Sequence, residues 1–380
     1  MCRLSAIISD SYFSTMENIM ALETMKEGHD GSGLGLVLRD LGGEFQGLKE
    51  FPILSGICSK EGLRVMDEYM VKLGFKTKHL WNPRIKDYRG IMKIRGFYFA
   101  RAYEYPEWAE EASPETQSEL LTKTSLELRD LGKGQDQGDD SIIIYSFWPD
   151  LITLKEVGDP LDVGLFFGLD KKPLLAKNIF AQGRQNTNYT INLYACHPFF
   201  IEGFTTMTNG ENTAFVPIRE FLSSRGFPGY VGYSSDSEVF CHILHYIRKE
   251  LKFPLKYYKD VITPLFDREM DERSDKAAIE LIKRVLRPLT IDGPNCTIGT
   301  DIDGTVFMAQ DSKKLRPGAI GGIPGKYALM SEICGVDSVV PERDRSKDVF
   351  PMKYDMAMIE KDAKEIKIWN QKHGSMSTVN

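Results

Sequence analysis

Residues 2–9 read CRLSAIIS, a thiol followed by Arg3 and then by a mainly apolar run. The apolar part predicts a buried strand, residues 15–26 predict a helix, and residues 34–39 (LGLVLR) predict a second strand. The glycine-rich GHDGSG at 28–33 predicts a turn between the helix and the second strand. The chain is therefore expected to open as strand, helix and strand, with Cys2 at the start of the first strand.

The rest of the chain shows strands in two batches. From about residue 176 short apolar strands resume, with helices expected near 216–225 and 236–252. One of these strands is expected at GFTTMT, before the two helices. Later strands are expected at CTIGT, TVFMAQ and YALMSE, followed by a charged helix near 356–371. Strand batches separated by helices predict two sheets layered with helices rather than a regular β-α-β alternation.

Two parts of the chain are expected to lie outside this core. The stretch from about 75 to 175 is predicted to be an insertion or extension, with the polar GKGQDQGDD at 132–140 as a loop or linker. Residues 346–380 are predicted to form a C-terminal helical tail, which leaves 1–345 as the main domain.

The composition of the 380 residues is that of a globular protein, with 42% hydrophobic and 27% charged residues. The formal net charge of −6 leaves no basic surplus for nucleic acid or an anionic membrane. The sequence shows neither a signal-peptide pattern nor an apolar run long enough to cross a bilayer, so we expect a cytoplasmic protein.

The six cysteines are scattered singly, so the sequence predicts neither a zinc site nor a disulfide framework. Five of them are expected to be buried small residues. Cys2 differs, because removal of Met1 would give it a free α-amine with a pKa of about 7.7–8.0, which can accept the thiol proton. The competing interpretation is an incidental cysteine at a frayed terminus.

A thiol nucleophile that acts on an amide also needs an oxyanion hole and groups that bind the substrate. Asn209 and Gly210, in TNGEN, could supply the oxyanion hole, although Asn-Gly is also a common hairpin turn. Arg184, in GRQNTN, could bind a carboxylate or be an ordinary surface charge. Asp236, in SSDSEV, could receive an ammonium group or be the N-cap of the helix that begins there.

These residues belong to a longer series of motifs that resembles the glutaminase domain of class II glutamine amidotransferases, in that family's order. The resemblance covers most of 1–60 and about 176–340, and its last three elements resemble the glutaminase portion of glutamate synthase. The motifs are Cys2, ALETMKEGHDGSGLGLV at 21–37, Arg184 in GRQNTN, His197-Pro198, NGEN at 209–212, Ser235-Asp236-Ser237, IDGP at 291–294, DSKKLRPG at 311–318 and SEICGVD at 331–337.

The resemblance implies an α+β fold, a four-layer α-β-β-α sandwich of the N-terminal nucleophile hydrolase type, with an insertion. It also implies L-glutamine as substrate and a separate synthase chain that receives the ammonia and carries FMN and an iron–sulfur cluster, with no cofactor or metal in this chain. The implied roles are Cys2 as nucleophile, Asn209 and Gly210 as oxyanion hole, Arg184 as carboxylate clamp, Asp236 as ammonium site and His197 at the border of the glutamine pocket.

The sequence departs from the family's pattern at three places. Arg3 stands where the family commonly has glycine, as in some stand-alone amidotransferase-like hydrolases, and Thr208 stands where a histidine usually precedes Asn-Gly. The usual HRG-type loop is GHDGSG at 28–33. A stand-alone γ-glutamyl amide hydrolase and an inactive scaffold subunit therefore stay open as alternatives.

Other motifs point to different chemistry. GTDIDGTV at 299–306 matches the signature of haloacid-dehalogenase-type phosphatases, but a hairpin with an Asp-Gly turn is the better interpretation. GSGLG at 31–35 and GGIPGKY at 321–327 lack complete phosphate-loop spacing. His242 and His245 could bind a metal, but no carboxylate or thiol motif accompanies them, which favours packing roles.

Overall fold

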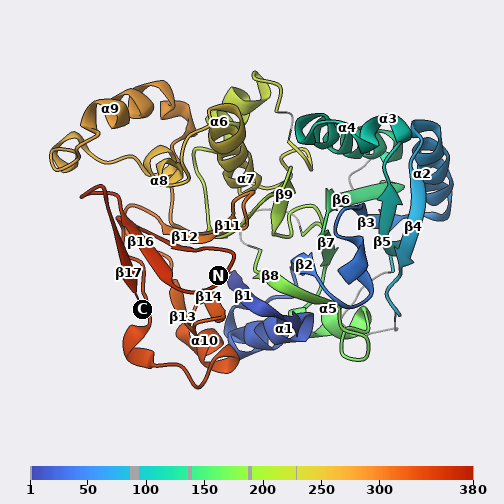
Figure 1. The fold of residues 1–380 in the computed structure, drawn as a ribbon, viewed down its shortest axis with the longest axis horizontal. Coiled ribbons are helices and arrows are strands. Elements are labelled where there is room, and N and C mark those ends of the chain that lie inside the picture. The colour runs from blue at the N-terminus through green and yellow to red at the C-terminus, as the bar shows by residue number, and fades with distance from the viewer. Residues whose placement is uncertain (1, 86–93, 136–138, 187–190, 228, 380) are drawn as a thin grey trace.

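The structure, a computed structural model, describes residues 2–85, 94–135, 139–186, 191–227 and 229–379. In this part of the chain the strands form three antiparallel sheets, of six, seven and four strands, with helices packed on their faces (Figure 1). Antiparallel sheets with helices grouped outside them make an α+β fold, as the sequence predicted.

The six-stranded sheet is built around the N-terminal strand. β1 (Arg3–Ser14) lies between β14 (Lys326–Met330) and β8 (Leu175–Arg184), so segments far apart in the sequence meet here. The strand predicted at 3–9 is confirmed, and it continues to Ser14. The other strands of this sheet, whose order is β13-β14-β1-β8-β2-β7, are β13 (Ala319–Ile323), β2 (Gly33–Leu41) and β7 (Leu151–Glu156).

The two faces of β1 contact different layers. Asn18 of α1 (Thr15–Thr24) donates to the Ser5 hydroxyl at 3.1 Å, so the odd-numbered side chains near the start of β1 face this helix. Leu4 and the other even-numbered side chains point the opposite way, toward the second sheet, which β1 contacts through β10 (Phe204–Gly210). Burial on both faces explains the continuous apolar run.

The seven-stranded sheet carries the later strands, and it confirms those expected at GFTTMT, CTIGT and TVFMAQ. Its order is β17-β16-β15-β12-β11-β10-β9. Besides β10, its strands are β9 (Phe199–Ile201), β11 (Asn295–Thr300), β12 (Val306–Gln310), β15 (Asp355–Ile359), β16 (Ile366–Asn370) and β17 (Ser375–Val379).

The helix expected near 356–371, and with it the helical tail expected at 346–380, is wrong. This segment instead forms β15, β16 and β17, and Met356 of β15 lies opposite Trp369 of β16. Ala363, in the turn between β15 and β16, has a left-handed conformation with φ of 50°. Nearly all of β15 is buried, so its side chains show no alternation, and pairing with β12 overrides the helical spacing of the charges.

The four-stranded sheet lies beside the other two, at the right of Figure 1. One face, with Leu54 and Phe99, packs with α2 (Lys60–Leu73) and α4 (Pro114–Gly132) in a small core of its own, and the other face joins the main core. Its strands, in spatial order, are β4 (Lys76–Trp81), β5 (Phe97–Glu104), β3 (Pro52–Cys58) and β6 (Ile142–Pro149), and the short α3 (Glu107–Glu110) precedes α4.

The boundaries of this sheet differ from the insertion expected at about 75–175. The sheet already begins with β3, before the expected range, whereas β7, which falls inside that range, belongs to the six-stranded sheet. Between β6 and β7 the chain turns at Asp150, in a left-handed conformation with φ of 52°, whose carboxylate accepts the Leu41 N–H at 2.7 Å. Because this connection is a single residue, the sequence contains no Gly-, Pro- or Ser-rich stretch that would mark the boundary between the two sheets. The loop expected at 132–140 lies partly outside the described residues.

Helices cover the outer faces of the two larger sheets (Figure 1). α1 and α10 pack on the six-stranded sheet with α5 beside them, and α7 packs on β9 and β10 with α6 beside it. The long helix expected at 236–252 is α7, which continues as a π-helical turn. The bounds are α5 (Pro160–Phe166), α6 (Phe215–Ser223), α7 (Glu238–His245), α8 (Tyr257–Ile262), α9 (Lys276–Val285) and α10 (Ile333–Val339).

The glycines of GSGLG allow a close approach of backbone segments. A Cβ added at Gly35 of β2 would lie 1.6 Å from the carbonyl oxygen of His197, and one added at Gly33 would lie 2.3 Å from Sγ of Cys196. These glycines therefore let the segment before β9 pack directly on β2. They serve the packing of this segment against β2.

Gly35→Ala should lower the free energy of unfolding by about 1–3 kcal/mol or more, because the new methyl group meets backbone that cannot rotate away. Urea denaturation measures the change. Gly47→Ala is the matched control, since Gly47 is exposed and no heavy atom lies within 4 Å of the added Cβ. Equal midpoints for the two variants would contradict the packing described for β2.

Candidate active site

Cys2 lies directly before β1, on the face turned toward the seven-stranded sheet. It is half-buried, and its Sγ accepts the Gln185 N–H at 3.4 Å and lies 3.5 Å from the Gln185 carbonyl oxygen. Arg3 pairs with Gly183 in β8, so the next step of the register brings Cys2 opposite Arg184. The structure therefore brings two of the residues chosen from the sequence, Cys2 and Arg184, to the same end of two neighbouring strands.

The backbone that follows Cys2 is held by the segment after β14. Leu4 N–H donates to the Ser331 hydroxyl at 2.6 Å, and Ser331 N–H donates to the Leu4 carbonyl at 3.0 Å. The Arg3 guanidinium forms an ion pair with Glu332 at 3.0 Å and donates to the Met25 carbonyl at 2.7 Å. These contacts fix the backbone from which the Cys2 side chain extends. They give Ser331 and Glu332, the first two residues of the SEICGVD motif, a structural role.

Arg184 is held by the segment that follows it and by the loop at 28–33. Its Nη2 donates to Oδ1 of Asn186 at 3.0 Å, and Asn186 N–H donates to Asp30 at 2.9 Å and to Ser32 at 3.0 Å. The Arg184 side chain is buried, so the interpretation as a surface charge is wrong. The last two residues of the GRQNTN motif, 187 and 188, lie outside the described residues.

Gln182 links the six-stranded sheet to the seven-stranded sheet close to Cys2 and Arg184. On β8 it lies opposite Leu4, and its Nε2 donates across the core to the carbonyl of Thr208 in β10 at 2.8 Å. Its Oε1 accepts the His197 N–H at 3.1 Å, and Nδ1 of His197 accepts the Thr208 N–H at 3.0 Å. His197 therefore contacts Thr208, the residue immediately before Asn209.

Asn209 and Gly210 are the last two residues of β10, and Thr208 before them is joined through Gln182 to the start of β1. Both pair in register with β11, Asn209 with Cys296 and Gly210 with Asn295, so the pair belongs to the strand and is not a two-residue hairpin turn. Cys241 of α7 contacts Thr206, so the alternation of β10 directs Asn209, three residues later, away from the helix and toward the six-stranded sheet. A Cβ at Gly210 would lie 2.0 Å from the Pro294 carbonyl oxygen, which requires glycine there.

Asp236 is bound to the turn that follows β10. Its Oδ2 accepts the Asn212 N–H at 2.8 Å, and the Ser235 and Ser237 hydroxyls lie 3.4 and 3.2 Å from its Oδ1. The N-cap of α7 is Ser237, so the alternative interpretation of Asp236 as that cap is wrong. Asp236 is thus connected to Asn209 through Asn212, which donates to Asp236 and lies three positions after Asn209 in the chain.

Four buried polar atoms in this region have no hydrogen-bond partner among the described residues. They are Nη1 of Arg184, Oε1 of Gln185, Nδ2 of Asn209 and Nδ2 of Asn212. Other unpartnered buried polar atoms are distributed over the described residues, but these four lie close together along the chain near Cys2 and at the end of β10. The set combines a cation, two amide donors and an amide acceptor, which suits a ligand with carboxylate, amide and ammonium groups.

The electrostatics of the site follow from burial. Burial raises the pKa of the Cys2 thiol above its ordinary value, and the Gln185 N–H and the Arg184 cation offset this only in part. Burial, and after it the positive charge of Arg184, lowers the pKa of His197 well below its usual range, so this imidazole is neutral and Nδ1 can accept a hydrogen bond. Burial also raises the pKa of the Asp236 carboxyl. The thiol therefore needs a base to react.

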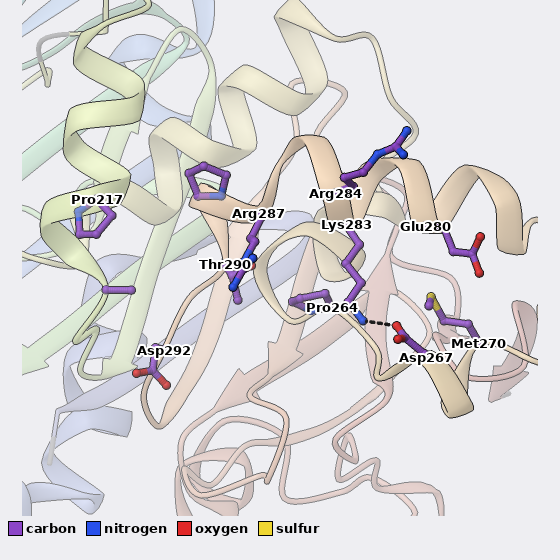
Figure 2. A pocket seen from close by; sticks show the side chains of 12 residues that line it. Pro217, Pro264, Asp267, Met270, Glu280, Lys283, Arg284, Arg287, Thr290 and Asp292 are labelled. Atoms are coloured by element: carbon purple, nitrogen blue, oxygen red, sulfur yellow. Dashed lines mark hydrogen bonds and ion pairs between the residues drawn. The ribbon is translucent and has the colours of Figure 1, made fainter.

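A cavity of about 1090 Å³ adjoins the turn that carries Asn212 (Figure 2). Its lower edge is Asp292, whose backbone carbonyl accepts the Thr213 N–H at 2.8 Å. In Figure 2, Lys283 points across the cavity to Asp267, and the two form an ion pair at 2.8 Å. The cavity lies between α6 and α9, and neither Cys2 nor Arg184 lines it.

The competing motifs have structural explanations. The GTDIDGTV segment forms the β11–β12 hairpin, as expected, and Asp301 is ion-paired with Arg248 at 2.7 Å. His242 and His245 contact Glu238 and Glu202, respectively. In the described part of the chain no cluster of three or more His, Cys, Asp or Glu residues could hold a metal ion. No described helix is both long enough and apolar enough to cross a membrane.

No family model and no curated protein matches this chain. Solved structures similar to it include glutamine phosphoribosylpyrophosphate (PRPP) amidotransferase from B. subtilis, complexed with ADP and GMP, and an allosteric regulatory enzyme of purine biosynthesis. Each has 13% sequence identity and covers 97% of this chain but 49% of its own, with TM-scores of 0.48 and 0.46. This chain thus spans about half the length of either protein.

Iodoacetamide should modify Cys2 and Cys334, which are half-buried, before the four buried cysteines. Because burial raises its pKa, Cys2 should react more slowly at pH 7 than free cysteine, and faster as the pH rises. Peptide mapping by mass spectrometry at timed intervals measures each rate, and a sample in denaturant gives all six sites. Modification of buried Cys241 as fast as Cys2 under native conditions would contradict this placement.

Proposed function

We propose that this chain is a class II glutamine amidotransferase that hydrolyses the side-chain amide of L-glutamine with Cys2 as nucleophile. The observation that carries the proposal is the position of Cys2, before the first strand and facing the second sheet, in a region with four unpartnered buried polar atoms among the described residues. The proposed fold type is the four-layer α-β-β-α sandwich of N-terminal nucleophile hydrolases. The helices outside the two facing sheets support it (Figure 1).

The proposed reaction begins with removal of Met1, which lies outside the described residues. The freed α-amine takes the thiol proton, and the Cys2 sulfur forms a bond to the carboxamide carbon of glutamine. Asn209 and Gly210 donate to the oxyanion, the C–N bond then breaks, and ammonia leaves with the proton held by the amine. Water hydrolyses the γ-glutamyl thioester, which releases glutamate and restores the thiol.

Arg184 and Asp236 would bind the two ends of the amino-acid group. The buried Nη1 of Arg184 has no partner among the described residues, so it is available for the α-carboxylate. Asp236 would accept the α-ammonium, and this opposite charge would counter the rise in pKa that burial causes. His197 would border the pocket and would act through Thr208, by fixing the end of β10 that carries Asn209.

A glutamate synthase-type partner is the proposed ammonia acceptor, a separate chain with FMN and an iron–sulfur cluster. Two of the three sequence motifs that resemble glutamate synthase, IDGP at 291–294 and SEICGVD at 331–337, contact segments of the proposed site. Asp292 of the IDGP motif contacts the turn at 212–213, and Ser331 and Glu332 of the SEICGVD motif hold the start of β1. We also propose that this chain is located in the cytoplasm.

The alternatives are a stand-alone γ-glutamyl amide hydrolase and an inactive scaffold subunit. The hydrolase was favoured by Arg3, but the Arg3 side chain contacts Met25 and Glu332 on the helix side of β1, so it does not favour a different pocket. The scaffold interpretation predicts that neither glutamine nor a glutamine-like electrophile reacts at Cys2. Purification of a flavoprotein bound to this chain would favour the synthase-coupled form over the hydrolase.

6-Diazo-5-oxo-L-norleucine, a glutamine-like electrophile, should add once to the protein and only at Cys2. Intact-mass analysis before and after treatment measures the adduct and shows whether Met1 is absent. Cys2→Ala should give no adduct, and Cys334→Ala, which removes the other half-buried thiol, should label like wild type. Retention of Met1 without labelling, even in the presence of a partner, would reject the proposed function.

Asn209→Ala should reduce glutaminase turnover by about 10²–10³, the usual effect of losing one oxyanion donor. The fold should survive, because Nδ2 of Asn209 bonds no described residue. Ammonia release measures turnover and urea denaturation measures stability. Asn178→Ala is the control, since this buried asparagine of β8 donates to Asp40 and should affect stability without a comparable loss of turnover. Full activity of Asn209→Ala would remove Asn209 from the mechanism.

A further inference from the structure

The four-stranded sheet and its helices contact two segments of the proposed glutamine site. Arg129, in the last turn of α4, donates from Nη1 to the carbonyls of Gly229 and Tyr230 at 2.8 and 3.0 Å. Asp140, just before β6, accepts a hydrogen bond from the Tyr194 hydroxyl. One contact holds the segment that leads to Asp236, and the other holds the segment that leads to His197.

The segment before Asp236 needs such support because its backbone is unusual. Gly229, Gly232 and Tyr233 have positive φ angles of 85°, 79° and 57°. The described residues of this segment therefore have no helical or strand hydrogen bonds to hold their backbone. Glu238, at the start of α7, accepts the Val231 and Tyr233 N–H groups at 2.9 and 2.7 Å. Glu238 thus binds the N–H groups of this segment, and Arg129 binds its carbonyls.

The two contacts from the four-stranded sheet lie at one place. Arg129, Asp140, Tyr194, Val231 and Ser234 all line a small cavity of about 240 Å³. Ser234 stands two positions before Asp236, and Tyr194 stands three positions before His197. A shift of α4 would therefore move both segments together.

We propose that Arg129 is a positioning residue for glutamine binding, and that the four-stranded sheet with α4 is part of the substrate site. This inference rests on the proposed function. Arg129 does not touch the substrate. It fixes the backbone that presents Asp236 to the α-ammonium group, so its loss should weaken the recognition of the amino-acid end of glutamine and leave the reactivity of Cys2 intact.

The test compares two reagents on the same thiol. 6-Diazo-5-oxo-L-norleucine carries the amino-acid group that Asp236 would bind, whereas iodoacetamide lacks it. Arg129→Met keeps most of the side-chain length without the guanidinium, and it should raise the KM for glutamine and lower the labelling efficiency of the glutamine-like reagent by about tenfold or more. Iodoacetamide should modify Cys2 at the wild-type rate. Arg129→Lys should fall between wild type and Arg129→Met.

Thr122→Val is the matched control, because Thr122 lies on the same helix and donates to Glu202 but does not contact the segment before Asp236. It should match wild type with both reagents. Unchanged KM and labelling in Arg129→Met, or equal slowing with both reagents, would overturn the inference while the proposed function stands. If wild type itself fails to react with the glutamine-like reagent, the proposed function falls and this inference falls with it.

Should Arg129→Met fail to fold, Tyr194→Phe provides the second variant. It removes the contact with Asp140 but keeps the aromatic ring that is buried in the core. The same selective loss of glutamine recognition is expected. Wild-type kinetics in a folded Tyr194→Phe protein would overturn the assignment of the four-stranded sheet to the site.

Discussion

The buried amide of Gln182 is the contact on which the site depends. Two sheets packed face to face are held mainly by apolar contacts, which set no unique register between them. Gln182 is fully buried and donates from one sheet to the Thr208 carbonyl of the other, while its oxygen accepts the His197 N–H. Buried polar groups favour the one arrangement that satisfies them, so this amide fixes the end of β1 against the end of β10.

Sequence reasoning recovered the parts of the molecule that local pattern determines. The strand, helix and strand at the start of the chain and the hairpin at GTDIDGTV follow from apolar runs and turn residues, and the structure has them. It also brings Cys2 and Arg184 together. Asn209 and Asp236 could be chosen only through the series of motifs to which they belong, since an Asn-Gly pair also fits a hairpin turn and an aspartate before a helix also fits an N-cap.

Other parts could not be predicted, because long-range pairing decides them. Residues 355–370 carry the charge spacing of a helix, yet β12 offers an unpaired edge and recruits them as strands. Gln182, Ser331 and Glu332 give no signal in isolation, since a single glutamine in an apolar strand or a Ser-Glu pair after one has many uses. Their roles appear only when β1, β8 and β14 are known to be neighbours.

Asp150 has a consequence for how this molecule can move. Hinged domains usually pivot on several residues that absorb large changes of φ and ψ, but here a single residue joins β6 to β7, and its carboxylate is already bonded to Leu41. The β6–β7 link therefore offers no hinge between the four-stranded and the six-stranded sheet. A hinge between the two sheets would therefore have to bend at their other link, residues 42–51 between β2 and β3.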